Sequence, residues 1–305
     1  MNPMLTVAMY HYVRDLPRTP YPGIRGMLLD HFREQLDRLG AGFEMATLES
    51  ALAFLRGAYR PARDLCLLTF DDGLKEHYTE VTGLLAERGI EGQFFVITGC
   101  VEERRVAPVH MNHFLTAALG FEVYREQFLR RLPAEAPGIE AVDPAAVARA
   151  YRWDTAEAGA LKYLFNFLLP AALRDGIVRE LFAEFLGEEA AFSDELYFNW
   201  EEARRMQEAG MRIGGHSHEH YSLGTRTDAQ QAEDLTACRQ ALDRNLRPQP
   251  QWPFCYPYGK RDSFNGTTIE LLRGLGFDCA FATEVGGNAP GADRFAIRRF
   301  DCKEL

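Results

Sequence analysis

Two adjacent carboxylates end an apolar run in the stretch CLLTFDDGLKEHY, residues 66–78. Asp71 and Asp72 follow a segment with the composition of a buried strand. Neighbouring negative charges repel each other, and burial makes each of them more costly, so a positive charge has to compensate them. A bound divalent metal would provide that charge.

A second polar stretch, GGHSHEH at residues 214–220, also follows a strand-like segment. One carboxylate and two imidazoles form a ligand set that catalytic zinc uses, with a position left open for water. We therefore expect one of the two aspartates and two of the three histidines to be metal ligands. A helical turn would bring His216 and His220 to one side, whereas a continued strand would align all three histidines. We favour the turn, which leaves His218 off the metal.

Two further strand ends carry polar side chains, namely MYHYV with His11 and CYPYG with Tyr258. The carboxyl ends of parallel strands lie at one face of a barrel or an open α/β sheet, so these segments should meet the carboxylates there. Each motif alone has an ordinary explanation, such as a solvated aspartate turn or a buried, hydrogen-bonded histidine. Their occurrence at the ends of separate predicted strands favours a common site.

Short apolar segments alternate with amphipathic helical patterns, which predicts an α/β fold with a parallel sheet. Strand character is found in eight segments, at residues 5–13, 43–48, 65–70, 92–98, 211–217, 253–258, 279–283 and 295–300. Helical patterns cover residues 28–40, 78–89 and 228–246, the last with Asp228 as its expected N-cap. We predict a (β/α) barrel, complete or incomplete, and an open doubly wound sheet is the alternative.

Residues 101–194 interrupt this alternation with purely helical patterns, at residues 110–132 and 159–187. A barrel does not need them. We therefore interpret residues 1–305 as a single barrel domain and residues 101–194 as a helical insertion within it. Insertions at the carboxyl ends of barrel strands usually build the substrate side of the site.

Composition narrows the class of protein. The net charge of −10 and the pI near 5.4 disfavour binding to nucleic acid or to an anionic membrane, because both require clustered basic residues. The chain shows no signal-peptide pattern and no apolar segment of membrane-spanning length. The six cysteines are scattered and include no CxxC pair, so we expect reduced packing residues in a cytoplasmic protein.

The motifs TFDDG, HSHEH (as H-S-x-x-H) and FCYPYG, followed by LLRGLGFDCAFAT, resemble in this order those of the polysaccharide deacetylases. This is the NodB-homology family, also called carbohydrate esterase family four. The resemblance covers about residues 4–98 and 199–300 and leaves the helical insertion unmatched. It implies a distorted (β/α) barrel and metal-dependent hydrolysis of N-acetyl, sometimes O-acetyl, groups on sugars.

The resemblance also implies roles for matching positions. Asp71 would be the general base, and Asp72, His216 and His220 would hold the metal. The backbone N–H of Tyr258 would help to hold the oxyanion. Zn²⁺ is the expected metal, with Co²⁺, Ni²⁺ or Mn²⁺ as alternatives.

The chain departs from the family pattern at two points. Cys255 stands where the family has an arginine that orients the base, and no histidine follows His220 to serve as the usual general acid. The stretch MYHYV resembles an amino-terminal motif of a branch that includes poly-N-acetylglucosamine deacetylases, so His11 is the expected acid. Arg298 in FAIRRF is the candidate to replace the arginine, with a surface salt bridge as its alternative role.

We therefore expect a metal-dependent N-deacetylase of a nucleotide-sugar, lipid-linked or glycan precursor, acting in surface polysaccharide synthesis. A hydrolase of a small non-sugar amide is the first alternative. A catalytically silent carbohydrate-binding module is the second, and the two departures from the family pattern support it. The sequence leaves open the sugar, N- versus O-deacetylation, the physiological metal and the oligomeric state.

Overall fold

The computed structural model describes residues 3–150 and 155–305. The chain divides into two compact units. We call the first the barrel unit; it comprises the chain up to Asp15, Arg25–Arg105 and Ser193–Leu305. The second, the helical unit, comprises Leu16–Ile24 and Val106–Phe192.

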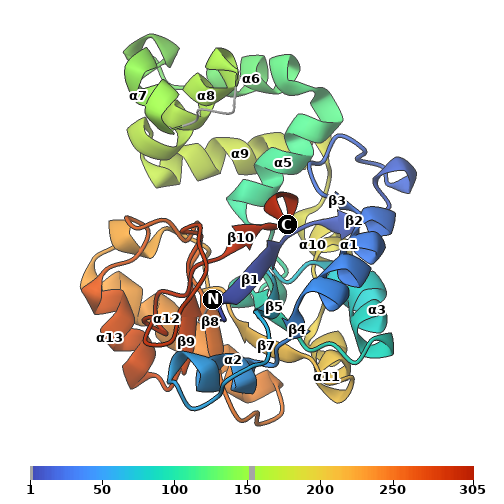
Figure 1. Cartoon of the computed structure of the whole chain (residues 1–305). Helices are drawn as coiled ribbons and strands as arrows, with labels where there is room; N and C mark the ends of the chain where they lie inside the picture. The colour runs from blue at the N-terminus through green and yellow to red at the C-terminus, as the bar shows by residue number, and fades with distance from the viewer. Residues whose placement is uncertain (1–2, 151–154) are drawn as a thin grey trace. The chain divides into compact units, whose positions relative to one another are not determined.

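The barrel unit is built on a parallel sheet with the strand order β10-β1-β5-β6-β7-β8-β9, and β4 pairs with β5 beside this path (Figure 1). The strands are β1 (Leu5–Tyr10), β4 (Glu44–Met45), β5 (Leu65–Phe70), β6 (Gly92–Val96), β7 (Arg212–Gly215), β8 (Pro253–Cys255), β9 (Cys279–Phe281) and β10 (Phe300–Asp301). Each predicted strand segment therefore contains or overlaps a strand, and the α/β fold class is confirmed. A separate short ribbon pairs β2 (Val13–Arg14) with β3 (Met27–Leu28).

The two ends of the strand path meet at a seam formed by the residues before β10. Ala282 N–H donates to the carbonyl of Ile297 at 2.9 Å, and Ile297 N–H donates to the carbonyl of Ala280 at 3.0 Å. On the other side, Ala8 of β1 is in register with Phe300 of β10. The sheet therefore curls into a distorted barrel, and the doubly wound alternative is wrong.

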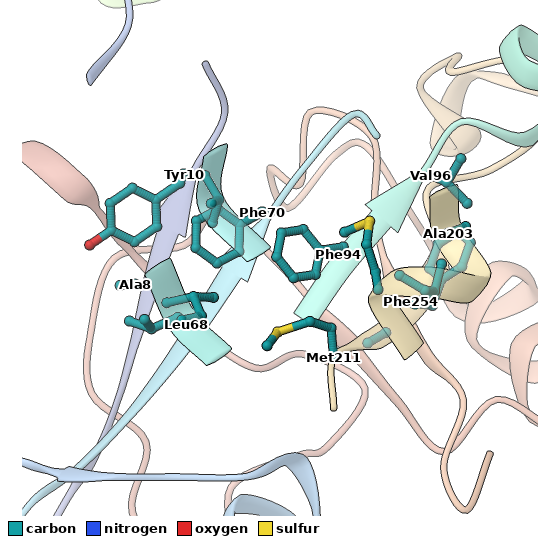
Figure 2. Close-up of a cluster of buried hydrophobic side chains, with 14 of the residues drawn as sticks. Ala8, Tyr10, Leu68, Phe70, Phe94, Val96, Ala203, Met211 and Phe254 are labelled. Atoms are coloured by element: carbon teal, nitrogen blue, oxygen red, sulfur yellow. The ribbon is translucent and has the colours of Figure 1, made fainter. Parts of the chain in front are cut away.

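Stacked aromatic rings fix three neighbouring strands directly below the polar strand ends. Tyr10 of β1 stacks on Phe70 of β5 at 5.0 Å between ring centroids, and Phe70 stacks on Phe94 of β6 at 4.7 Å. All three side chains are fully buried, and Figure 2 shows their rings in a row across the sheet. Because His11 and Asp71 are the next residues along β1 and β5, this packing fixes the backbone positions from which their side chains extend.

Seven helices complete the barrel unit: α1 (Leu29–Gly42), α2 (Leu48–Leu55), α3 (Thr82–Glu87), α4 (Thr98–Glu102), α11 (Trp200–Glu208), α12 (Asp228–Asn245) and α13 (Gly266–Gly274). The N-cap of α12 is Thr227 rather than the expected Asp228, because the Thr227 hydroxyl accepts the backbone N–H of Gln230 in a capping box. The helical pattern predicted for residues 78–89 begins with a π-helical turn, η2 (His77–Val81), which leads into α3.

The helical unit contains α5 (Pro108–Leu119), α6 (Phe121–Arg130), α7 (Pro144–Ala150), α8 (Ala156–Tyr163) and α9 (Ala171–Phe185), and α10 (Glu189–Leu196) begins in it. The predicted helix 110–132 is interrupted at Gly120, whose φ of 78° is not helical. Tyr21, from the segment Leu16–Ile24, packs edge-on against Phe114 at 5.0 Å. The assignment of residues 101–194 as an insertion within a single domain stays a prediction.

Among the helices that the structure describes, none is both long enough and apolar enough to cross a membrane. All six cysteines lie in the described part of the chain, where they are buried and carry free thiols.

Candidate active site

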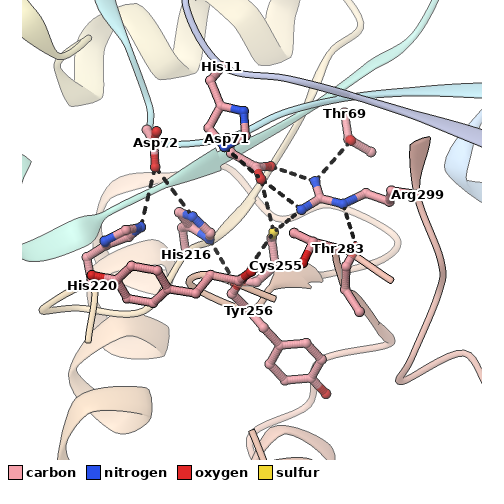
Figure 3. A network of polar contacts seen from close by, with 12 residues as sticks. His11, Thr69, Asp71, Asp72, His216, His220, Cys255, Tyr256, Thr283 and Arg299 are labelled. Atoms are coloured by element: carbon pink, nitrogen blue, oxygen red, sulfur yellow. Dashed lines mark hydrogen bonds and ion pairs between the residues drawn. The ribbon is translucent and has the colours of Figure 1, made fainter. Parts of the chain in front are cut away.

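The ends of β1, β5, β7 and β8 bring polar residues together at one place in the barrel unit (Figure 3). His11 follows β1, and Asp71 and Asp72 follow β5. His216 follows β7, and Cys255 is the last residue of β8. The Asp71 N–H donates to the Tyr10 carbonyl at 2.9 Å, which continues the β1–β5 ladder to the first carboxylate.

Asp72, His216 and His220 form a buried cluster. The Nε2 atoms of His216 and His220 lie 3.4 and 3.5 Å from Asp72 Oδ1. In Figure 3 the Asp72 carboxylate contacts both imidazoles. All three side chains are buried, and their potential ligand atoms lie within 4.8 Å of one another. The structure therefore groups the three predicted metal ligands.

The turn that joins His216 to His220 is not the helical turn expected from the sequence. Ser217 and His220 have φ angles of 61° and 58°, in the left-handed region. The His220 N–H donates to the Ser217 hydroxyl at 2.9 Å, which closes the turn. Each such non-glycine conformation costs about 1–3 kcal/mol and tends to occur at functional sites.

The turn after β5 is equally constrained. Asp72 and Gly73 have consecutive left-handed φ angles of 79° and 70°. A Cβ atom on Gly73 would lie 3.1–3.2 Å from Val96, so both the backbone conformation and the close approach require glycine. This explains why a glycine follows the two carboxylates.

The donor set fits a divalent cation. His216 Nδ1 lies 2.8 Å from the Cys255 carbonyl, which can only accept, so Nδ1 carries a hydrogen and Nε2, which faces Asp72, is the nitrogen that could coordinate an ion. Metal-bound histidines are oriented in this way. Burial alone would lower the pKa of His216, but Cys255 and the Asp72 carboxylate raise that pKa well above its ordinary value. The cluster therefore favours a positive charge, which is what a metal ion brings.

His218 lies apart from this cluster. Its Nδ1 is 2.9 Å from the Thr98 hydroxyl, and its Nε2 is 3.3 Å from the Glu103 carboxylate. The backbone N–H of His218 donates to Asp234 at 2.9 Å. Its ring therefore contacts Thr98 and Glu103, at the two ends of α4, and not the Asp72–His216–His220 cluster.

Asp71 forms a buried, two-point ion pair with Arg299. Both guanidinium Nη atoms lie 2.8 Å from the two carboxylate oxygens, and the side chains are 0% and 2% exposed. Burial by itself would raise the pKa of Asp71, but the charge and hydrogen bonds of Arg299 outweigh it and lower the pKa to about 2. Asp71 is therefore an ionised carboxylate with a fixed orientation.

Arg298 does not orient the base, so that expectation is wrong, and its alternative role in a surface salt bridge is confirmed. The Arg298 side chain is 51% exposed, and its guanidinium lies 3.7 Å from Glu284. Its neighbour Arg299 contacts Asp71 instead, because successive side chains of an extended segment point to opposite faces. Ile297, two residues earlier, is buried, and the same period of two places residue 299 on the inner face, which is the sequence signal that could have identified it.

Cys255 and Arg299 share the space beside the carboxylate. The Cys255 Sγ atom lies 3.5 Å from Asp71 Oδ2 and 3.1 Å from Arg299 Nη2. Arg299 also donates to the Ala282 carbonyl at 2.8 Å and to the Thr69 hydroxyl at 3.1 Å. The small thiol at the end of β8 leaves room for a guanidinium that comes from the seam.

His11 and Tyr258 flank the buried groups at the solvent side. The His11 Nε2 atom lies 3.8 Å from Asp71 Oδ2, and its side chain is 43% exposed. Tyr258 is also 43% exposed, has a φ of 63°, and its ring centroid lies 5.3 Å from that of His220. Of the catalytic and metal-ligating residues predicted from the sequence, Arg298 alone points away from the site.

Comparison with known families gives one family model. The polysaccharide deacetylase model matches residues 58–135 and 180–280. The matched residues include both carboxylates and both clustered histidines, and they extend into the helical unit further than the motifs indicated. His11 and Arg299 lie outside the matched residues, so only the structure connects them with Asp71.

Solved structures of similar fold cover nearly the whole chain. The deacetylase PplD of Streptococcus pyogenes, in complex with acetate, aligns with a TM-score of 0.61 and 15% identity over 99% of this chain and 93% of its own. IcaB from Ammonifex degensii aligns at 0.59 and 21% over 99% and 92%. The BpsB deacetylase domain from Bordetella bronchiseptica aligns at 0.54 and 15% over 97% and 94%. At these identities the likeness concerns the fold. No curated protein sequence matches the chain.

Proposed function

Because the chain belongs to the polysaccharide deacetylase family, we propose that it is a metal-dependent hydrolase that removes N-acetyl groups from a sugar or glycan precursor. The observation that carries the proposal is the pairing of the Asp72–His216–His220 cluster with an ionised carboxylate, Asp71, on the adjacent residue. The proposed substrates are nucleotide-sugar, lipid-linked or glycan precursors of a surface polysaccharide. A cytoplasmic location is part of the proposal, and its support is the six buried free thiols.

Asp72, His216 and His220 would hold the metal, for which Zn²⁺ is the expected ion. A carboxylate oxygen and two imidazole nitrogens that face one another support this assignment. When bound, such an ion polarises a carbonyl group and lowers the pKa of a water molecule.

Asp71 would act as the general base. Its two oxygens are held by Arg299, so the carboxylate cannot rotate and stays unprotonated at neutral pH. A carboxylate with so low a pKa accepts a proton readily only from an acidic donor, and a water with a lowered pKa is such a donor. Arg299 is thus a positioning residue for the base.

His11 would act as the general acid. The nitrogen of an N-acetyl group has to receive a proton as the C–N bond breaks, because an amine anion is a poor leaving group. The partly exposed His11 ring beside Asp71 can reach a bound substrate from the solvent side. The backbone N–H of Tyr258 would hold the carbonyl oxygen as negative charge develops on it.

The catalytically silent alternative rested on a missing arginine and a missing histidine. Arg299 contacts the carboxylate that such an arginine would orient, and His11 stands beside the same carboxylate, so both observations support an enzyme. The small-amide alternative would use the same groups on a different substrate.

Acetate release by the full chain, loaded with Zn²⁺, tests the proposal on N-acetylated sugar oligomers, N-acetylated nucleotide-sugars and small non-sugar amides. The Asp71→Asn variant is the matched control, because it keeps size and placement but cannot accept a proton. We expect its activity to fall about 10²- to 10⁴-fold with unchanged metal content. Hydrolysis of small amides alone would favour the first alternative, and metal-loaded protein inactive on every substrate would refute the proposal.

A further inference from the structure

His77 lies directly below the site and contacts the segment that carries His11. Its side chain is fully buried, and its ring lies 5.6 Å from the rings of both Phe70 and Phe94. The Nε2 atom of His77 is 2.8 Å from the backbone carbonyl of His11. Because a carbonyl oxygen only accepts, His77 is the donor and its hydrogen is on Nε2.

The other ring nitrogen makes histidine a costly residue at this position. Nδ1 of His77 is buried and has no hydrogen-bond partner among the residues that the structure describes. A buried polar atom without a partner costs about 1–3 kcal/mol. Phenylalanine would fill the same aromatic surroundings without that cost. The imidazole differs usefully from a phenyl ring in one respect, its hydrogen bond to the His11 carbonyl.

The backbone under His77 is held firmly. His77 opens the π-helical turn η2, and its carbonyl accepts the Thr82 hydroxyl at 2.7 Å as well as the Thr82 N–H. π-Helical turns are rare in proteins overall, and those that occur are often found at functional sites. Burial lowers the pKa of His77 to about 4, so the ring is neutral and has a single N–H to donate at neutral pH.

The preceding residue contacts the same segment from the same turn. Glu76 accepts two hydrogen bonds of 2.8 Å from the guanidinium of Arg14, and both side chains are largely buried. Two consecutive residues after the DDG turn therefore bind the backbone and a side chain within residues 11–14. This matters for His11, whose own side chain is 43% exposed and is not fixed by packing.

We infer that His77 is a positioning residue that holds His11 at the distance from Asp71 needed for proton donation to the leaving amine. This inference rests on the proposed function, because it assigns His77 a role through the proposed acid. The hydrogen bond fixes the backbone at His11, and this limits the positions that the His11 ring can reach.

His77→Phe removes the donor and keeps the aromatic volume. We expect kcat on an N-acetyl sugar to fall about 10- to 100-fold with little change in KM, since small misplacements of a reacting group have effects of this size. An aryl acetate, whose phenolate leaves without a proton, should be hydrolysed within a few-fold of wild type. Phe94→Leu is the matched control for packing, because Phe94 touches His77 but contributes no hydrogen bond.

Two further variants keep the test decisive if His77→Phe does not fold. His77→Gln places an amide N–H near the position of Nε2 and should keep most activity, whereas the shorter His77→Asn cannot reach the carbonyl and should lose it. Equal activity of the two would overturn the inference. In a His11→Ala background, His77→Phe should cause no further loss, because its effect acts through His11.

Hydrogen exchange provides a readout that needs no catalysis. Backbone amides of residues 8–14 should exchange faster in His77→Phe than in wild type or in Phe94→Leu. Unchanged exchange together with equal losses on both substrates would overturn the inference while leaving the deacetylase function in place. If the wild type lacks activity but exchange responds as expected, the proposed function fails and the structural contact stands.

Discussion

Replacement of Arg299 by methionine tests the central ion pair of the site. Methionine keeps much of the side-chain volume and removes the charge and all the donors. The loss leaves the Asp71 carboxylate 2% exposed and without a cation, while the hydrogen bonds to Ala282 and Thr69 disappear as well. Arg298→Met is the matched control, since Arg298 is the neighbouring residue and its partner Glu284 is 57% exposed.

The structure gives very different magnitudes for the two substitutions. Removal of one partner of a buried ion pair typically costs about 3–5 kcal/mol of unfolding free energy. An exposed pair such as Arg298–Glu284 contributes about 0–1 kcal/mol. Urea unfolding followed by circular dichroism should therefore separate Arg299→Met from Arg298→Met by several kcal/mol. Arg299→Lys should be intermediate, because an ammonium group keeps the charge but cannot contact both oxygens.

The pH dependence of stability gives the sign of the effect. In the folded wild type the pKa of Asp71 is lowered from 3.8 to about 2, which corresponds to about 2 kcal/mol of stability above pH 4, lost as the pH falls toward 2. Without Arg299, burial raises the pKa of Asp71 above its ordinary value. Protonation of Asp71 then removes the cost of burying its charge, so the variant becomes more stable as the pH falls. The stability difference between wild type and Arg299→Met should therefore shrink from pH 7 to pH 4.

Activity should follow the same ionisation. The acid limb of the pH–rate profile should move to higher pH in Arg299→Met, because Asp71 can act as a base only when it is unprotonated. The reasoning is refuted if Arg298→Met costs as much stability as Arg299→Met, or if the pH profile of Arg299→Met coincides with that of wild type.

Two further predictions concern the metal and the acid. Alanine at Asp72, His216 or His220 should remove most bound metal in elemental analysis, because a three-ligand site has no spare donor, whereas His218→Ala should retain it. Stoichiometric metal in Asp72→Ala would contradict this ligand set. His11→Ala should keep its metal and lose activity on N-acetyl substrates, with a smaller loss on an aryl acetate whose leaving group needs no proton. Equal losses on both substrates would mean that His11 binds or positions the substrate instead.

The sheet and the grouping of the site were predictable because local patterns determine them. Residues 65–70 are apolar throughout and form a fully buried strand, and parallel strands bring their carboxyl ends together whatever lies between them in the chain. The cluster of Asp72, His216 and His220 follows from that topology together with the motifs.

The remaining features depend on conformations or contacts that short patterns do not encode. The left-handed φ angles at Ser217 and His220 occur at residues other than glycine, so the sequence predicts a helical turn where the structure has a different one. Two arginines are adjacent in the sequence, and the alternation of side chains along an extended segment points the second of them, Arg299, inward. His77 lies in an ordinary helical pattern, and only the three-dimensional contact with the His11 carbonyl distinguishes it from a packing residue.

The position of Arg299 just before the last strand has a consequence for the growing chain. During translation, His11 and Asp71 leave the ribosome long before the seam residues are made, and domains begin to fold as they emerge. A nascent chain that ends before Ile297 lacks both the hydrogen bonds that join the end of β9 to the seam and the guanidinium that neutralises Asp71. Burial of that carboxylate is then unfavourable, so the barrel closes late, and a prematurely terminated chain contains the metal-ligand motifs without an oriented base. Synthesis as far as Arg299 is in this way a condition for a neutralised and oriented Asp71 carboxylate.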